Sequence, residues 1–261
     1  MPELPEVEIA KRLLSRWTSG RKIQRIESND PLSVSGDSQQ LQGCYFVQWL
    51  RRGKNLLGES SGEFGLLSHL GMTGKWVADP PKDRPHQRLI IRFADDALPR
   101  CVALIDSRRF GRSEFLPKSD MHNHPRLTGL GMEPMELDFN GAFLEASLAR
   151  SNAPWKQKLL EQKVVAGLGN IALSEIGWRS GIHPHKACRQ LSLAQWNSLA
   201  RCTKEHLSYV LDAEDGEEIT YLVEKTAVNP FFCYGREGEP CPRCDTAFER
   251  EVLSGRATFF C

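Results

Sequence analysis

The first residues of the chain contain an amine that could act as a nucleophile. The sequence begins Met1-Pro2-Glu3, and an initiator methionine is usually removed before a small residue such as proline, which would leave Pro2 with a free secondary amine. An α-amino group titrates near pH ~8, so a sizeable fraction is neutral at neutral pH, whereas a lysine is mostly protonated. The positive end of a helix that starts near Pro5 would lower the pKa of this amine further. On these residues alone, a frayed terminus with a helix cap is the simpler interpretation.

A free amine at Pro2 suits covalent chemistry on a sugar. A secondary amine that attacks C1′ expels the base and leaves an iminium, a Schiff base that serves as an electron sink for elimination. Glu3 and Glu6 lie near enough in the sequence to supply the general acid or base that such steps need.

The cysteines near the C-terminal end predict a metal site. Of the eight cysteines, four are scattered singly and four lie close together, namely Cys233, Cys241, Cys244 and Cys261. The acidic start of the chain is unlike a secretory signal, so we expect thiols and not disulfides. Cys241 and Cys244 are separated only by Pro242 and Arg243. They form a knuckle that can place both sulfurs on one structural Zn²⁺ ion, with Cys261 as the third ligand.

The fourth zinc ligand is left open by the sequence. At ribbon spacing it would fall shortly beyond Cys261, the last residue. Three alternatives stand side by side: further residues follow Cys261, Cys233 serves as a substitute, or no metal binds and the hairpin is stable by packing alone.

Hydrophobic spacing divides the chain into a β-rich first part and a helical second part. Pro5 suits a first helical turn and apolar residues recur on one face through Trp17, which predicts a helix over 5–17. Short apolar runs between turn-like stretches predict strands over 20–115 that pack as a sandwich or barrel. The spacing is helical from about 139 to 225, and the cysteine-bearing tail is expected to be a β-hairpin.

We therefore expect an α+β protein with four parts. Residues 1–117 would form an N-terminal β-sandwich domain that begins with the helix, and 118–134 a linker rich in Gly, Pro and His. Residues 135–226 would form a helical domain, and 231–261 the zinc-binding β-hairpin.

Composition excludes some classes of protein but does not identify a partner. Of the 261 residues, 40% are hydrophobic and 26% are charged, as in an ordinary globular protein, and no apolar run is long enough for a membrane span. We therefore expect a cytoplasmic protein. The net charge of +1 requires that any surface for nucleic acid be local. Short basic clusters occur at Arg51-Arg52-Lys54, Arg108-Arg109-Arg112 and Lys156-Lys158-Lys163, and solvated faces are the simpler interpretation of each alone.

Motifs in order along nearly the whole chain resemble those of the bacterial formamidopyrimidine-DNA glycosylases, which are related to the endonuclease VIII type. They are PELPEVE at 2–8, RRGKNLL at 51–57, SHLGMTG at 68–74, DSRRFG at 106–111, GLGNIALSE at 167–175, GIHP at 181–184, YGREGEPCPRC at 234–244 and GRATFFC at 255–261. The resemblance implies a helix-two-turns-helix motif in the helical domain and a structural zinc ion in the tail.

The resemblance also implies catalytic roles at four positions. Pro2 would be the nucleophile that forms the Schiff base, and Glu3 the proton donor that helps open the sugar ring. Lys54 would be a second proton donor for β-elimination, and Arg256 would hold the phosphates around the lesion and assist δ-elimination.

Seven further residues would contact DNA. Met72, Arg108 and Phe110 match the family's residues that fill the space left by a flipped base, where apolar wedges and a stacking arginine are suitable. His86 matches a DNA-contacting histidine, and His69, Lys156 and Asn170 would contact phosphates, Asn170 at the start of a helix. Core packing is the alternative for Met72 and Phe110.

The implied function is base excision repair of double-stranded damaged DNA by a bacterial, monomeric enzyme. It would remove oxidised bases, most readily oxidised purines, and then cut the strand. A short segment between Gly216 and Tyr234 and an alanine at Ala172 depart from the family pattern. The short segment leaves open an endonuclease VIII-like preference for oxidised pyrimidines or abasic sites. Retention of Met1 would instead leave a protein that binds damaged DNA without cutting it.

Overall fold

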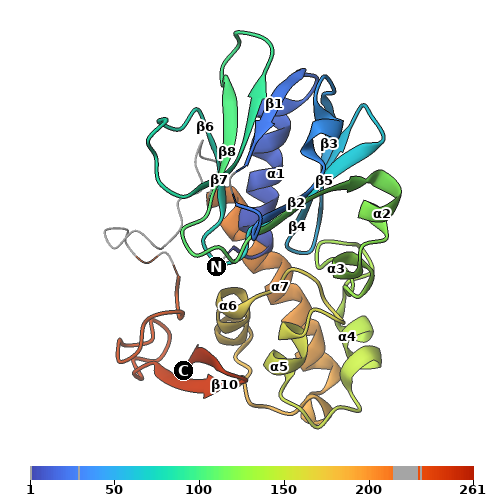
Figure 1. Cartoon of the computed structure of the whole chain (residues 1–261). Helices are drawn as coiled ribbons and strands as arrows, with labels where there is room; N and C mark the ends of the chain where they lie inside the picture. The colour runs from blue at the N-terminus through green and yellow to red at the C-terminus, as the bar shows by residue number, and fades with distance from the viewer. Residues whose placement is uncertain (1, 29, 214–228, 230) are drawn as a thin grey trace. The chain divides into compact units, whose positions relative to one another are not determined.

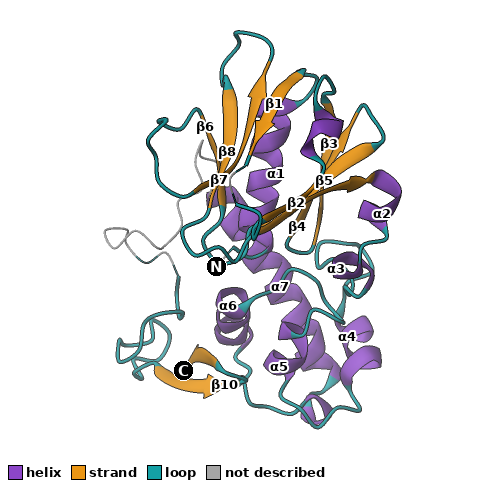
Figure 2. Ribbon diagram, in the orientation of Figure 1, coloured by secondary structure: helices purple, strands orange, loops and turns teal. Residues whose placement is uncertain are grey.

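A computed structural model describes residues 2–28, 30–213, 229 and 231–261. The described residues form two compact units, one through Thr128 and the other from Gly129 onward. Figure 1 shows the course of the chain, and Figure 2 shows that strands dominate the first unit and helices the second. Most of the short segment between Gly216 and Tyr234 lies outside the described residues.

The first unit contains two β-sheets. One has the strand order β1-β7-β8-β6 and the other β2-β9-β5-β4-β3. The strands of the first sheet are β1 (Ile23–Glu27), β6 (Lys75–Ala78), β7 (Gln87–Phe93) and β8 (Cys101–Ile105). Those of the second are β2 (Val34–Gly36), β3 (Phe46–Arg52), β4 (Asn55–Ser60), β5 (Phe64–His69) and β9 (Arg112–Pro117), with a 3-10 turn η1 (Ser38–Leu41) after β2.

Helix α1 (Leu4–Thr18) contacts both sheets, through β3 and β4 of one and β6 of the other. Its apolar face is buried at Leu4, Val7 and Leu14, because these residues recur at helical spacing. At its end the indole N–H of Trp49 donates to the Thr18 hydroxyl at 2.8 Å. Packing against both sheets thus fixes the position of α1, including its first residues.

In the described part of the second unit, four helices pack together: α4 (Gly141–Leu148), α5 (Trp155–Leu160), α6 (Asn170–Ser180) and α7 (Leu193–Ala213). The 3-10 turn η2 (Cys188–Gln190) precedes α7. Both α4 and α6 pack on α7, and α5 packs on α6. Between α5 and α6 the chain passes through left-handed backbone at Gln162 (φ 63°) and Gly167 (φ 87°). These two reversals allow the helices to follow each other closely.

The tail is a two-stranded hairpin of β10 (Glu249–Leu253) and β11 (Arg256–Phe260), and β11 packs on α6. The carboxylate of Glu175, a buried residue of α6, accepts hydrogen bonds from three consecutive backbone N–H groups, those of Phe232, Cys233 and Tyr234, at 2.8–3.1 Å. This carboxylate fastens the chain to α6 where it enters the hairpin.

The expected fold class is confirmed: a β-sandwich with an N-terminal helix, a helical second unit and a terminal hairpin. The segment expected as a linker, 118–134, contains two short helices, α2 (Lys118–His122) and α3 (Pro125–Thr128). In the part of the chain that the structure describes, no helix combines the length and apolar character needed to cross a bilayer.

Candidate functional site

The candidate nucleophile near the start of the chain is enclosed by protein. Pro2 is buried, and Glu3 is only 3% exposed where α1 begins. The Glu6 carboxylate reaches back to accept the backbone N–H of Glu3 at 2.8 Å, as in a capping box. Glu3 and Glu6 therefore start the helix, and Glu3 is buried next to the candidate nucleophile in the chain.

Glu6 is tuned to exchange a proton near neutral pH. Burial and the neighbouring Glu3 carboxyl raise the pKa of Glu6 to about 7. A carboxylic acid with such a pKa can both hold and release a proton at neutral pH. From the sequence, Glu6 was a candidate acid or base only because it lies close to Pro2 in the chain. The structure shows in addition that its carboxylate bonds to the Glu3 backbone.

Lys54 and His69 come together at one end of the five-stranded sheet. Lys54 lies in the tight turn between β3 and β4, where Gly53 takes a left-handed φ of 54°. The next residue, Asn55, pairs with His69 at the end of β5. Pairing of the two strands thus brings the candidate proton donor and a candidate phosphate ligand close together.

The environment of His69 keeps its imidazole neutral. The Gly71 N–H donates to His69 Nδ1 at 3.0 Å, so in the neutral ring the proton is on Nε2. Burial, Arg126 and Lys54 lower the pKa of His69 to about 4. The ring therefore offers an N–H donor at neutral pH, which suits contact with a phosphate oxygen.

The residues expected to fill a gap in DNA lie on two loops of the first unit. Met72 is partly buried in the turn after β5, whereas Arg108 and Phe110 are exposed in the loop after β8. The Arg108 guanidinium lies over the Phe110 ring at 4.9 Å from its centroid. Phe110 is 50% exposed, so core packing does not account for it. His86, also exposed, takes a left-handed φ of 69° before β7.

Three further candidate residues gather where β11 meets α5 and α6 in the second unit. Lys156 is fully buried, and its ammonium donates to the hydroxyls of Ser174 and Thr258 at 2.9 and 3.0 Å. Asn170, the first residue of α6, donates to the Ala257 carbonyl at 2.7 Å. Arg256, at the start of β11, is exposed.

The burial of Lys156 differs from the surface phosphate contact that the sequence suggested. Its side chain cross-links α5, α6 and β11, and so positions Asn170 and Arg256 relative to each other. The hydroxyls of Ser174 and Thr258 accept the bonds that keep this buried charge tolerable. Neither hydroxyl stood out in the sequence, because serine and threonine are common at exposed positions.

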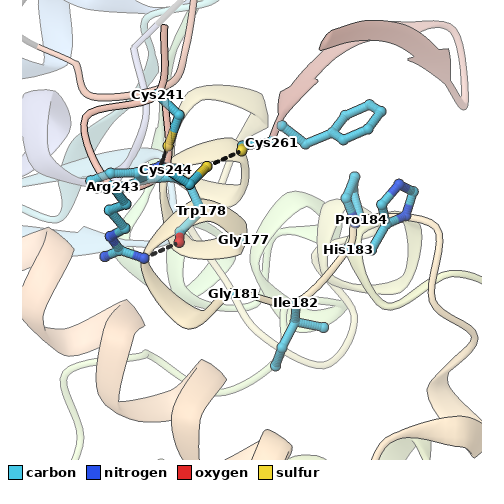
Figure 3. Close-up of a pocket in the computed structure, with 11 residues that line it drawn as sticks. Gly177, Trp178, Gly181, Ile182, His183, Pro184, Cys241, Arg243, Cys244 and Cys261 are labelled. Carbon is cyan, nitrogen blue, oxygen red and sulfur yellow. Dashed lines mark hydrogen bonds between the residues drawn. The ribbon is translucent and has the colours of Figure 1, made fainter. Parts of the chain in front are cut away.

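Three cysteine sulfurs cluster in the tail. Those of Cys241, Cys244 and Cys261 lie within 4.8 Å of one another, and Figure 3 shows them on the wall of a pocket of about 180 Å³ that the loop after α6 completes. Trp178 Nε1 donates to Cys241 Sγ at 3.3 Å. Although burial opposes the effect, this bond and the Arg243 backbone N–H lower the pKa of Cys241 to about 7. Three cysteine sulfurs this close together are a donor set typical of structural zinc, so these residues fit a structural zinc site.

Cys233 lies outside this group of three among the described residues. It is packed in a small core with Cys241, Phe248 and Phe259. The sequence suggested Cys233 as a substitute ligand, whereas its surroundings here are those of a core residue.

Comparison with known proteins matches three stretches of the chain to family models. Family models match residues 1–113 (the formamidopyrimidine-DNA glycosylase N-terminal domain), 130–220 (the H2TH domain of the same enzymes) and 238–261 (a zinc finger found in FPG and IleRS). The formamidopyrimidine-DNA glycosylase of Bdellovibrio bacteriovorus is 36% identical, and that of Cereibacter sphaeroides 34%. Each alignment covers 100% of this chain and 98% of the relative.

Solved structures of formamidopyrimidine-DNA glycosylases have the same fold as this chain. MutM from Thermus thermophilus has a TM-score of 0.86 at 31% identity, covering 100% of this chain and 97% of that one. Lactococcus lactis Fpg, bound to DNA with an N7-benzyl-Fapy-dG, has a TM-score of 0.88 at 33% identity, covering 100% and 98%. A helical N-terminus on a β-sandwich, an H2TH domain and a cysteine hairpin together define a DNA glycosylase. The chain belongs to the formamidopyrimidine-DNA glycosylase family.

Proposed function

We propose that the protein is a bifunctional glycosylase and abasic-site lyase that acts on double-stranded DNA containing oxidised purines. The observation that carries the proposal is the enclosed N-terminus, where Pro2 is buried beside Glu3 and the near-neutral acid Glu6. The substrate class is supported by a MutM structure in complex with DNA that contains carbocyclic 8-oxo-G, which has a TM-score of 0.88 at 32% identity.

The reaction begins once Met1 has been removed. The Pro2 nitrogen attacks C1′ of the damaged nucleotide, the bond from C1′ to the base breaks, and the base leaves with the electron pair and a proton. Glu3 donates a proton to the ring oxygen, so the sugar opens and an iminium forms between Pro2 and C1′. The partly buried Glu6 carboxylate accepts the Glu3 backbone N–H at 2.8 Å and so keeps the acid beside the nucleophile.

Strand cleavage follows from the iminium. Loss of a C2′ proton expels the 3′ phosphate in β-elimination, and loss of a C4′ proton then expels the 5′ phosphate in δ-elimination. Lys54 supplies a proton in the first step, and the exposed Arg256 holds the phosphates for the second. His69 and Asn170 donate neutral N–H groups to the DNA phosphates. Lys156 fixes the positions of Asn170 and Arg256 relative to each other, because it bonds to both α6 and β11.

A Zn²⁺ ion would be held by Cys241, Cys244 and Cys261. It would supply structural cross-linking of the hairpin that carries Arg256 and would take no part in the reaction.

Borohydride reduction tests the proposal directly. Wild-type protein with Met1 removed, as verified by mass spectrometry, should be trapped covalently on duplex DNA containing 8-oxoguanine or a formamidopyrimidine, because borohydride reduces the iminium. Pro2→Gly should bind this DNA but lose most strand cleavage. The absence of any trapped adduct from the processed protein would refute the proposal, and preferential cleavage of oxidised pyrimidines would reassign the substrate to the endonuclease VIII type.

A further inference from the structure

A buried carboxylate connects the two loops that carry the exposed wedge residues. Asp106 follows β8 and has no exposed surface. Its Oδ1 accepts the Thr73 hydroxyl at 2.5 Å and the Arg108 N–H at 3.2 Å, and its Oδ2 accepts the Gly111 N–H at 2.8 Å. One side chain thus bonds to the turn after β5 and to both sides of Phe110.

The Thr73 hydroxyl is the second half of this link. Besides donating to Asp106, it lies within 3.3 Å of the Arg108 N–H and of the Ser107 hydroxyl, both of which donate to it. Thr73 directly follows Met72, the third wedge residue. The hydrogen bonds of the Thr73 hydroxyl therefore tie the backbone next to Met72 to the loop that carries Arg108 and Phe110.

The backbones of the two loops are also in direct contact. Gly71 has a φ of +65°, and a Cβ at this position would lie 2.3 Å from the Phe110 carbonyl carbon and 2.4 Å from the Gly111 nitrogen. Such distances are far below van der Waals contact, so the approach requires glycine. The link between Asp106 and Thr73 therefore spans a close-packed junction.

The backbone of Asp106 extends the junction to a fourth candidate DNA contact. Its N–H donates to the His86 carbonyl at 3.0 Å, and Arg88 Nε donates to its carbonyl at 2.7 Å. Arg88 and Arg109 both pair with the buried Asp30 carboxylate, at 3.3 and 3.0 Å. One network of hydrogen bonds and ion pairs, centred on the buried Asp106 and Asp30, thus joins the segments of His86, Arg108 and Phe110.

We propose that Asp106, acting through Thr73, is a positioning residue that makes Met72, Arg108 and Phe110 enter the DNA as one preorganised unit. The inference rests on the proposed function, which assigns these three side chains to the space left by the everted nucleotide. Independent loops would each lose conformational freedom on insertion, whereas linked loops have lost it in advance. Hydrogen bonds to a buried carboxylate are strong enough to maintain such a link.

Thr73→Val tests the link, with Thr73→Ser as the matched control. Valine keeps the shape but removes the hydroxyl, and serine keeps the hydroxyl. The readout is the stopped-flow fluorescence of 2-aminopurine next to a tetrahydrofuran abasic analogue in duplex DNA, which reports wedge insertion without cleavage. We expect Thr73→Val to slow insertion by about tenfold, the effect of losing one hydrogen bond to a charged group. Thr73→Ser should stay within about twofold of wild type on the same scale.

A second comparison separates positioning from general loss of structure. In the Phe110→Ala background, Thr73→Val should cost less than about threefold, because the loop no longer carries its main wedge and the two effects are coupled. Borohydride trapping on single-stranded abasic DNA, which has no opposite strand to fill, should fall much less than insertion into duplex.

Equal insertion rates for wild type and Thr73→Val would overturn the proposal, as would additive effects of Thr73→Val and Phe110→Ala. An equal loss by Thr73→Ser would also overturn it, because the hydroxyl would then not be the cause. Failure of the wild type to form a borohydride adduct would instead count against the Pro2 chemistry, since the fluorescence readout requires no covalent step.

Discussion

Neutral His69 should make the stability of the protein depend on pH in a predictable direction. The replacement His69→Asn keeps an acceptor near the position of Nδ1, where the Gly71 N–H donates at 3.0 Å, but it does not titrate. In the wild type, the folded state holds the pKa of His69 at about 4 instead of the usual 6.5. Between these values the unfolded chain binds the proton more readily than the folded one, so acid favours unfolding.

The size of the effect follows from those two values. The full difference corresponds to about 3 kcal/mol of unfolding free energy. This contribution to the stability of the folded state is fully present above pH 6.5 and is lost as the pH falls toward 4. By about pH 5, wild type should have lost about 2 kcal/mol that His69→Asn retains. Because burial is the largest cause and the cations Arg126 and Lys54 are secondary, high salt should reduce the effect only in part.

The difference can be measured by urea unfolding, followed by tryptophan fluorescence, at a series of pH values from about 7.5 to about 5. The expected change in the difference between the two unfolding free energies is about 2 kcal/mol. The difference between the two unfolding free energies should change steadily across the series. If the two proteins instead lose stability in parallel, then the folded state does not lower the pKa of His69, and the reasoning from its burial is refuted.

Three other changes probe separate parts of the structure. Arg256→Ala should weaken binding to every lesion alike and reduce the salt slope of the binding constant by about 1. Arg250→Ala on the neighbouring strand β10 is its control, and a loss restricted to one lesion would contradict a phosphate contact. Gly71→Ala should destabilise the protein more than Gly20→Ala, since both have positive φ but only Gly71 faces backbone atoms within 3 Å. Thermal melting checks this, and equal shifts would show that the junction yields easily. Cys244→Ser should remove bound zinc as measured by elemental analysis, whereas Cys233→Ser should retain it, and the reverse result would make Cys233 a ligand.

The helix and strand pattern could be predicted because local spacing determines it. The helix expected over 5–17 is α1 (Leu4–Thr18), and its start follows from Glu3, Pro5 and Glu6, which are adjacent in the sequence. The strands over 20–115 follow in the same way from short apolar runs between turns. Their division into two sheets with crossed order depends on pairings between distant segments, which no local pattern reveals.

The candidate site was only partly accessible to sequence reasoning. Phe110 is half exposed, in agreement with a wedge and not with the core. Lys156 illustrates the opposite case, because lysine is rarely buried and only its distant partners Ser174 and Thr258 make burial tolerable. Asp106 lies within the motif DSRRFG, but its partner Thr73 is separated from it by three strands, so their link could not be foreseen.

The three hydrogen bonds that Glu175 accepts from residues 232–234 have a consequence for how the protein can change. They anchor the chain at the entrance to the hairpin, independently of whatever precedes residue 229. We expect changes ahead of this anchor to leave the register of β10 and β11 unchanged. The anchor therefore makes the attachment of the Arg256 hairpin to α6 a local property of Glu175 and residues 232–234.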